Sequence, residues 1–278
     1  MKKKYSIQGG GYKLSLIANC ISLALFIIIG VWKFDSIKRR FSNIFIKQQT
    51  SEKVLKSFNN DYFDLFLNEE HIVNPESECV EFLFLGNSLT YTGVPEEEAD
   101  KTKRGLTSTK IENDYVHRLI SMYAKKYDVN VKFSCVNIAD FERGFLEKEF
   151  TKDSLKNIQV KNPDIVIFQI GENVSLDELK NNEGLFFERY CGLINCFKDS
   201  QKVVCIPFWP IKEKINVITD VAFETNSRIC DLSHLGSGID EENFASSYKY
   251  YKQPGVGSHP GDVGMERIAK NLLCVLDD

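Results

Sequence analysis

The stretch from Val80 to Thr90, VEFLFLGNSLT, is a short apolar run that ends abruptly in Gly-Asn-Ser. An apolar run bounded by turn residues is typical of a buried strand in a parallel sheet. Ligands of such sheets bind in the crevice outside the carboxyl ends of the strands. Ser88 therefore stands where a nucleophile would be useful, although the same residues also fit a simple turn with Ser88 as a helix N-cap.

Segments typical of strands and of helices alternate along the rest of the chain. The predicted strands lie at 80–85, 129–136, 164–170, 202–208 and 228–232, and the predicted helices lie at 111–126, 183–198, 215–225 and 262–276. This alternation indicates βαβ units. We therefore predict a three-layer α/β/α domain around a mostly parallel, five-stranded sheet, with the charged segment 91–110 as a loop beside the site.

Residues 14–32, LSLIANCISLALFIIIGVW, carry no charge and are flanked by lysines and arginines. A stretch of this length spans the hydrocarbon core of a bilayer as a helix. Since no good signal-peptide cleavage site follows, we predict an uncleaved transmembrane anchor, with a buried core helix as the alternative. The predicted organisation is a basic tail at 1–13, the anchor at 14–32, a helical stalk or linker at 33–75 and one domain at 76–278. The basic residues on the two sides nearly balance, so they leave the orientation open.

The composition narrows the class of protein. The 278 residues are 43% hydrophobic and 27% charged, which is ordinary for a globular protein, and this length is enough for one full α/β core. The net charge of −4, with no long basic block, does not suggest a nucleic-acid partner. The eight cysteines include no CxxC pair, so we expect buried free thiols rather than a zinc site, and one disulfide stays open.

Three predicted element ends carry side chains that acyl transfer uses. Ser88 follows the first strand, Asn173 follows the third, and His259 precedes the last helix. A serine hydroxyl needs a base within hydrogen-bonding distance, and the tetrahedral oxyanion needs N–H donors. Each residue also has a simpler explanation: Asn173 as a turn residue, and His259 as a surface residue before a helix that Asp262 caps.

The motifs FLGNSLT, IGENV and SHPGD, in this order and at these separations, resemble the serine, asparagine and histidine blocks of the SGNH/GDSL hydrolase superfamily. The resemblance covers residues 79–278, and the stretches ENDYVH at 112–117 and HPGDVGM at 259–265 are similar to a little-characterised bacterial branch. In such branches Gly-Asn-Ser replaces the more usual Gly-Asp-Ser. The resemblance implies a flavodoxin-like sheet and an esterase or deacylase that needs no metal or other cofactor.

The resemblance also implies roles for individual residues. Ser88 would be the nucleophile and would supply its own backbone N–H to the oxyanion. His259 would be the general base, and Asn173 an oxyanion donor. A third backbone donor would come from the loop after the second strand, near Glu142, and Gly171 would support the site from the turn that holds Asn173.

One position departs from the superfamily's pattern, and two others stay ambiguous. The superfamily commonly has Asp three residues before the histidine, where this chain has Val256, so a backbone carbonyl or another carboxylate must orient His259. His117 and Asp262 are possible site residues, although packing for the former and helix capping for the latter are the simpler explanations.

These observations lead to a functional hypothesis and its rivals. We expect a single-pass membrane protein whose extracytoplasmic domain cleaves an ester, such as an O-acetyl group on a carbohydrate, through a Ser–His mechanism. The anchor and the superfamily prompt the glycan ester, and the frequent export of the enzymes that the chain resembles prompts the side of the membrane. An acyltransferase that uses the same site and a non-catalytic binding module are the alternatives. Nucleotide binding is disfavoured because no Gly-x-Gly-x-x-Gly follows the first strand.

Overall fold

The computed structural model describes residues 66–92, 104–147, 155 and 160–277. The predicted tail at 1–13, the predicted anchor at 14–32 and most of the predicted stalk lie outside these residues. Within the described ranges, no helix has the length and apolar character needed to cross a membrane.

Six strands form one sheet at the centre of the described part of the chain. They are β1 (Phe66–His71), β2 (Cys79–Gly86), β3 (Asn130–Asn137), β4 (Ile165–Gln169), β5 (Gln201–Ile206) and β6 (Arg228–Asp231). Their order is β1-β3-β2-β4-β5-β6, with β1 antiparallel to β3 and all other pairs parallel. The α/β class and the mostly parallel sheet are thereby confirmed.

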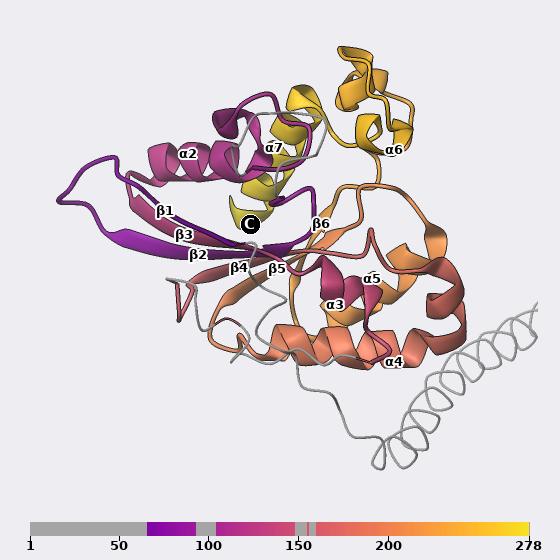
Figure 1. Cartoon of the computed structure of the whole chain (residues 1–278). Coiled ribbons are helices and arrows are strands. Elements are labelled where there is room, and N and C mark those ends of the chain that lie inside the picture. Colours follow the sequence, from indigo (N-terminus) through magenta and orange to yellow (C-terminus); the bar gives the residue numbers. More distant parts are fainter. Residues whose placement is uncertain (1–65, 93–103, 148–154, 156–159, 278) are drawn as a thin grey trace, which may run out of the picture. The chain divides into compact units, whose positions relative to one another are not determined.

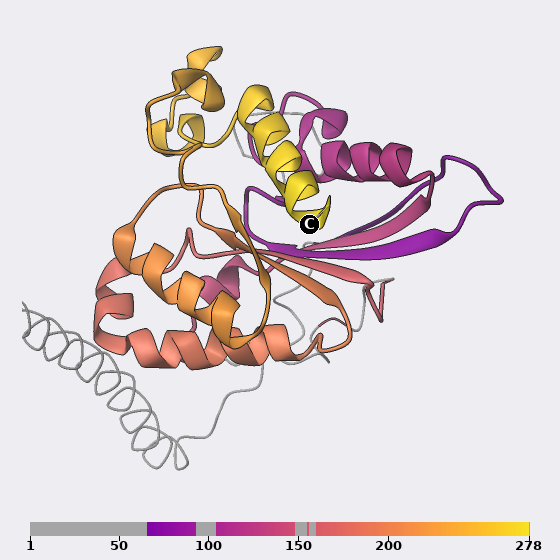
Figure 2. The same cartoon turned by 180° about the vertical axis from the view of Figure 1, so that it is seen from behind.

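The helices cover both faces of this sheet, as Figures 1 and 2 show. They are α2 (Tyr115–Tyr127), α3 (Ala139–Arg143), α4 (Leu176–Asn195), α5 (Lys212–Glu224), α6 (Pro254–Gly257) and α7 (Asp262–Asp277). Helices α2 and α7 lie on one face, and α3, α4 and α5 lie on the other. The three predicted layers are present.

The prediction of five strands is wrong, because β1 adds a sixth at the edge. This strand falls inside the segment predicted as a helical stalk, so the sheet also extends before the predicted boundary at residue 76. Its sequence, FLNEEH, has no β-branched residue, and local propensity therefore favours a helix. Pairing with β3 overrides that preference, and the Ser134 hydroxyl donates to Asn68 Oδ1 across the pair at 2.7 Å.

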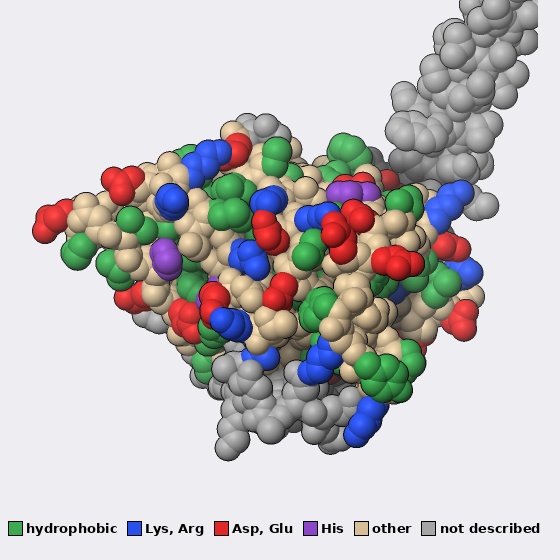
Figure 3. Space-filling model, turned by 90° about the horizontal axis from the view of Figure 1, so that it is seen from above, with side chains coloured by type: hydrophobic (Ala, Val, Ile, Leu, Met, Phe, Trp, Pro, Cys, Tyr) green, Lys and Arg blue, Asp and Glu red, His purple; other side chains and the backbone are tan. Residues whose placement is uncertain are grey.

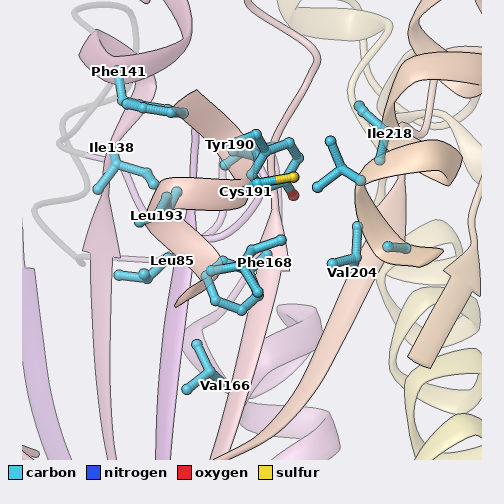
Figure 4. Close-up of a cluster of buried hydrophobic side chains, with 14 of the residues drawn as sticks. Leu85, Ile138, Phe141, Val166, Phe168, Tyr190, Cys191, Leu193, Val204 and Ile218 are labelled. Atoms are coloured by element: carbon cyan, nitrogen blue, oxygen red, sulfur yellow. The ribbon is translucent and has the colours of Figure 1, made fainter. Parts of the chain in front are cut away.

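Alternate residues of β2 enter two separate hydrophobic cores. Phe82 and Phe84 face α2 and α7, whereas Leu83 and Leu85 face α3, α4 and α5. Figure 4 shows the second core, where strand side chains such as Leu85 and Phe168 meet Tyr190 and Leu193 of α4. Burial on both faces explains why β2 reads as a continuous apolar run.

Neither the cysteines nor the surface charges of the described residues suggest a special site. The seven described cysteines form no disulfide with one another, and Cys135, Cys191, Cys205 and Cys230 are buried. On the face seen in Figure 3, basic and acidic side chains are interspersed rather than separated into fields of one sign.

The strand order places a switch point beside β2. From β2 the chain passes to β3 on one side, and then crosses to β4 on the other side. Ligands of doubly wound sheets bind where the strand order reverses in this way. Ser88, two residues beyond the end of β2, lies at this point.

Candidate active site

The nucleophile turn follows directly from the sequence after β2. The backbone carbonyl of Asn87 accepts hydrogen bonds from Thr90 N at 3.1 Å and Tyr91 N at 3.0 Å, which closes a tight turn around Ser88. Gly86 allows this approach, since a Cβ there would lie 1.9 Å from Thr90 Oγ1. The backbone N–H of Ser88 donates to no acceptor among the described residues.

Ser88 and His259 come together from opposite ends of the domain. Ser88 Oγ lies 3.1 Å from His259 Nε2, a hydrogen-bonding distance for a serine and its base. The structure thus brings together two of the residues that the sequence singled out.

A backbone carbonyl orients the imidazole in place of a carboxylate. His259 Nδ1 lies 2.8 Å from the carbonyl oxygen of Gly255, so Nδ1 carries the proton and donates it. The Nε2 lone pair then faces the Ser88 hydroxyl. Burial lowers the pKa of His259, although backbone hydrogen bonds with Gly255 and Val256 act in the opposite direction. The imidazole is therefore neutral near pH 7 and ready to accept a proton.

Residues 104–109 tie the serine turn to the histidine loop. Leu106 N donates to the carbonyl of Ser88 at 2.8 Å, and the Thr107 hydroxyl donates to the carbonyl of Pro260 at 3.0 Å. Trp209, in the loop after β5, packs edge to face with His259 at a centroid separation of 5.1 Å. The described part of the predicted 91–110 loop thus lies beside the site, and residues 93–103 fall outside the described ranges.

Asn173 lies in the turn between β4 and α4, with both ends of its amide held. Asn173 Nδ2 donates to Glu142 Oε2 at 2.8 Å, and Asn173 Oδ1 accepts from Arg143 Nη2 at 3.1 Å. These two bonds decide which end of the amide is nitrogen.

Glu142 takes part through its side chain, a role that sequence reasoning did not foresee. The residue is fully buried in α3, and its Oε1 accepts the backbone N–H of Gly171 at 2.5 Å. Gly171 therefore supports the turn but does not have its N–H free for an oxyanion. Its φ of +126° favours glycine strongly, because side chains rarely adopt that conformation, and a Cβ there would also lie 2.6 Å from Ile218 Cδ1.

A second carboxylate, Glu172, was missed altogether. Glu172 Oε2 accepts from Asn87 Nδ2 at 2.8 Å, and Oε1 accepts from Gln169 Nε2 at 2.7 Å and Phe208 N at 3.0 Å. The available signal was a charged residue at the end of the apolar strand sequence IVIFQ.

Both carboxylates have a raised pKa because both are buried, and the charge of Glu172 adds to the effect on Glu142. Burial, followed by the charge of Glu172, raises the pKa of Glu142 to about 7, and hydrogen bonds from Asn173 and Gly171 oppose the rise. Burial also raises the pKa of Glu172. Lys214 donates to the carbonyl of Glu172 at 2.8 Å, and burial lowers the pKa of this lysine.

Asp262 and His117 make contacts outside the Ser–His pair. The Asp262 carboxylate accepts from Thr109 N at 2.8 Å and from Asn113 Nδ2 at 2.9 Å, which fastens the start of α7 to the loop. His117 Nδ1 lies 2.8 Å from Asp114 Oδ1, and His117 Nε2 lies 3.0 Å from Glu69 Oε2. It therefore joins α2 to β1.

His117 is expected to make the stability of the domain depend on pH. Burial alone would lower its pKa, but the hydrogen bonds and charges of Asp114 and Glu69 outweigh burial and raise it. A raised pKa means that the folded state holds the proton more tightly, so the stabilisation is complete below the unfolded pKa of about 6.5 and is lost as pH rises through the folded pKa.

The measurement compares wild type with His117→Asn by urea unfolding at pH 6 and pH 9. We expect His117→Asn to lose on the order of 1 kcal/mol more at pH 6 than at pH 9. An equal loss at both pH values would contradict a charged His117 bridge.

Comparisons with known proteins were made by sequence and by structure. No protein-family model matches the sequence, and no curated protein matches it. A two-domain esterase active on acetylated mannans shares 17% identity at a TM-score of 0.47, over 72% of this chain and 49% of that one. The chain thus spans about half the length of that esterase.

Two further solved structures match over most of their own length. The psychrotrophic esterase EstA from Pseudoalteromonas sp. shares 13% identity at a TM-score of 0.45, over 71% of this chain and 96% of that one. A chain from Slackia heliotrinireducens, described as an SGNH hydrolase, shares 16% identity at a TM-score of 0.41, over 72% of this chain and 100% of that one. The chain is thus similar in fold, at low sequence identity, to two esterases and to a chain described as an SGNH hydrolase.

Proposed function

We propose that this protein is a carboxylic ester hydrolase of the SGNH type, with Ser88 as nucleophile and His259 as general base. The observation that carries the proposal is the 3.1 Å separation of Ser88 Oγ and His259 Nε2, with the Gly255 carbonyl 2.8 Å from Nδ1. Together these contacts direct the imidazole lone pair at the hydroxyl.

The reaction proceeds in two halves. His259 Nε2 takes the Ser88 proton as Oγ attacks the ester carbonyl, and the resulting oxyanion accepts hydrogen bonds from the Ser88 N–H and the free Asn173 Nδ2–H. Collapse of this intermediate expels the alcohol, which receives the proton from His259. Water then attacks the acyl-enzyme with the same base, releasing the acid and the free Ser88.

The partial charge of a carbonyl oxygen stabilises an imidazolium less than a full carboxylate would. The Gly255 carbonyl nevertheless fixes the ring's tautomer and orientation, which are two of the contributions that a triad aspartate makes. We therefore expect a working Ser–His dyad, and this expectation favours an enzyme over the binding-module alternative.

The proposed substrate is a small acyl ester of a carbohydrate, and the proposed location is outside the cytoplasmic membrane. Both rest on the uncharged segment 14–32 and on the sequence motifs rather than on the geometry of the site. A topology reporter fused after residue 278 tests the location: activity of an exported reporter supports it, and activity of only a cytoplasmic reporter overturns it.

A fluorophosphonate probe tests the nucleophile directly. The full-length chain, purified in a mild detergent, is incubated with the probe before and after heat denaturation, and adducts are located by peptide mass spectrometry. We expect labelling of Ser88 in the folded protein only, together with turnover of aryl acetate. A folded protein with no adduct on Ser88 would instead support a non-catalytic binding module.

Acyl transfer to an alcohol uses the same acyl-enzyme, so the acceptor distinguishes it from hydrolysis. The assay above is repeated with added glycan or simple alcohol, and the acylated product is measured by mass spectrometry. Free acid as the main product supports the hydrolase.

A further inference from the structure

We propose that Glu142 and Arg143 are positioning residues, which clamp the Asn173 amide so that its second Nδ2 hydrogen is directed to the substrate oxyanion. This inference rests on the proposed function. In this proposal, two adjacent side chains of α3 position the side-chain donor of the oxyanion site.

The first step is that the clamp grips the amide at both ends. Glu142 Oε2 takes one Nδ2 hydrogen at 2.8 Å, and Arg143 Nη2 donates to Oδ1 at 3.1 Å. A primary amide has two N–H donors, so one Nδ2 hydrogen stays available. If the amide turned over, its oxygen would face the developing negative charge instead of its nitrogen.

The second step is that Glu142 must be an acceptor on both of its oxygens. Oε1 receives the N–H of Gly171 at 2.5 Å, the N–H of Asn173 at 3.3 Å and Asn87 Nδ2 at 3.3 Å, while Oε2 receives Asn173 Nδ2. Among neutral and charged side chains of this shape, only an ionised carboxylate accepts at every position. Because the pKa of Glu142 is raised to about 7, this set of hydrogen bonds is complete only above that pH, where the carboxylate is ionised. A glutamine would set its own NH₂ against a donor in either orientation.

The third step links the clamp to the nucleophile. Asn87, whose Nδ2 reaches Glu142, is the residue before Ser88 and forms the turn that presents it. The β4–α4 turn, which carries Gly171 and Asn173, follows the strand that pairs directly with β2. The Glu142 carboxylate therefore hydrogen-bonds both to the turn that presents Ser88 and to the turn that carries Asn173, and it fixes the position of one turn relative to the other.

The fourth step concerns cost. Glu142 is 0% exposed and stands near the charge of Glu172, with Lys214 as the nearby cation. A buried carboxylate destabilises a fold unless hydrogen bonds compensate for the lost water. An apolar side chain at this position of α3 would pack without the free-energy cost of burying a carboxylate. Packing alone therefore does not account for an acid at position 142.

The test separates kcat from KM in the full-length chain with aryl acetate as substrate. Glu142→Gln is expected to lower kcat by roughly 10²-fold, the size of effect seen when one oxyanion donor is lost, with little change in KM. Arg143→Ala, at an exposed residue, is expected to lower kcat about 5-fold. Glu147→Gln, an exposed acid of the same segment, is the matched control and should leave both constants unchanged.

A double-mutant cycle with Asn173→Ala identifies the route of the effect. If Glu142 acts through Asn173, adding Glu142→Gln to Asn173→Ala changes kcat little further. A full additional 10²-fold loss would overturn the positioning role. If Glu142→Gln does not fold, Arg143→Ala decides, and an unchanged kcat in that variant overturns the clamp.

The outcome for wild type keeps the two proposals apart. A wild-type chain that neither turns over ester nor reacts with the fluorophosphonate refutes the proposed function. An active wild type with an equally active Glu142→Gln refutes only the clamp.

Discussion

Ser88→Ala is expected to lower kcat for aryl ester hydrolysis by about 10³-fold or more, without unfolding the protein. Removal of a serine nucleophile abolishes the acyl-enzyme route, and what remains comes from binding and the oxyanion donors. Alanine keeps the backbone N–H of residue 88, so the oxyanion site loses no donor. It leaves His259 Nε2 without its 3.1 Å partner, a small change for a residue that is only partly buried.

The measurement compares steady-state kinetics and thermal unfolding of wild type, Ser88→Ala and Ser237→Ala. Ser237 donates to the His234 carbonyl at 2.8 Å, outside the proposed site, and serves as the matched control. Equal kcat in wild type and Ser88→Ala would refute the serine mechanism, whereas a loss of kcat in Ser237→Ala as well would point to general damage.

The positions of Ser88, Asn173 and His259 were predictable because parallel strands fix where their ends lie. Each residue follows or precedes a strongly patterned element, and the carboxyl ends of β2 and β4 are adjacent in the sheet. Local patterns were therefore enough to place these three residues in one region.

The acceptor for His259 Nδ1 was not predictable. Every residue has a backbone carbonyl, so nothing in the sequence distinguishes Gly255 as the residue whose carbonyl accepts from His259 Nδ1. Only the conformation of the α6 turn decides which carbonyl meets the ring. Because Val256 stands where the superfamily commonly has Asp, the sequence indicated that another group must accept the Nδ1 hydrogen, but it did not indicate which group.

The start of α4 shows a signal that was present and overlooked. The helix was predicted from residue 183 but begins at Leu176, where the Ser175 side chain accepts from Glu178 N. Serine followed three residues later by glutamate is a capping-box pattern. Asn182 has non-helical φ of −138°, and this kink hides the first turns from a search for regular periodicity.

The buried carboxylates Glu142 and Glu172 lie in different segments, so no local window contains both. Their meeting depends on α3 and the β4–α4 turn being brought together by the sheet. This explains why Glu142 was assigned a backbone role and Glu172 none. It also gives a physical reason for Asn rather than Asp at position 87.

Asn87→Asp is expected to destabilise the domain by about 3–5 kcal/mol, the range seen when one partner of a buried charged pair is removed. Asn87 Nδ2 donates to Glu172 Oε2 at 2.8 Å and to Glu142 Oε1 at 3.3 Å, and Asn87 is 0% exposed. Aspartate would replace these two donors by an acceptor and place a third carboxylate beside two others. Protonating one of the three is the only relief, so the variant should recover partly as pH falls towards 5.

A donor exchange tests this explanation against simple intolerance of position 87. In Asn87→Asp with Glu172→Gln, the charge count of wild type is restored and the new amide of residue 172 donates to the new carboxylate of residue 87. Urea unfolding should show the double variant more stable than Asn87→Asp alone by about 1–3 kcal/mol, a coupling typical of residues in one network. Asn181→Asp, an exposed asparagine on α4, is the control and should change stability by at most about 0.5 kcal/mol. If Asn87→Asp is as stable as wild type at pH 8, the two glutamates do not depend on the Asn87 amide. Electrostatics would then not explain why residue 87 is asparagine rather than aspartate. If instead it is destabilised and Glu172→Gln restores it, the asparagine of the nucleophile turn is there because two buried acids need a donor between them.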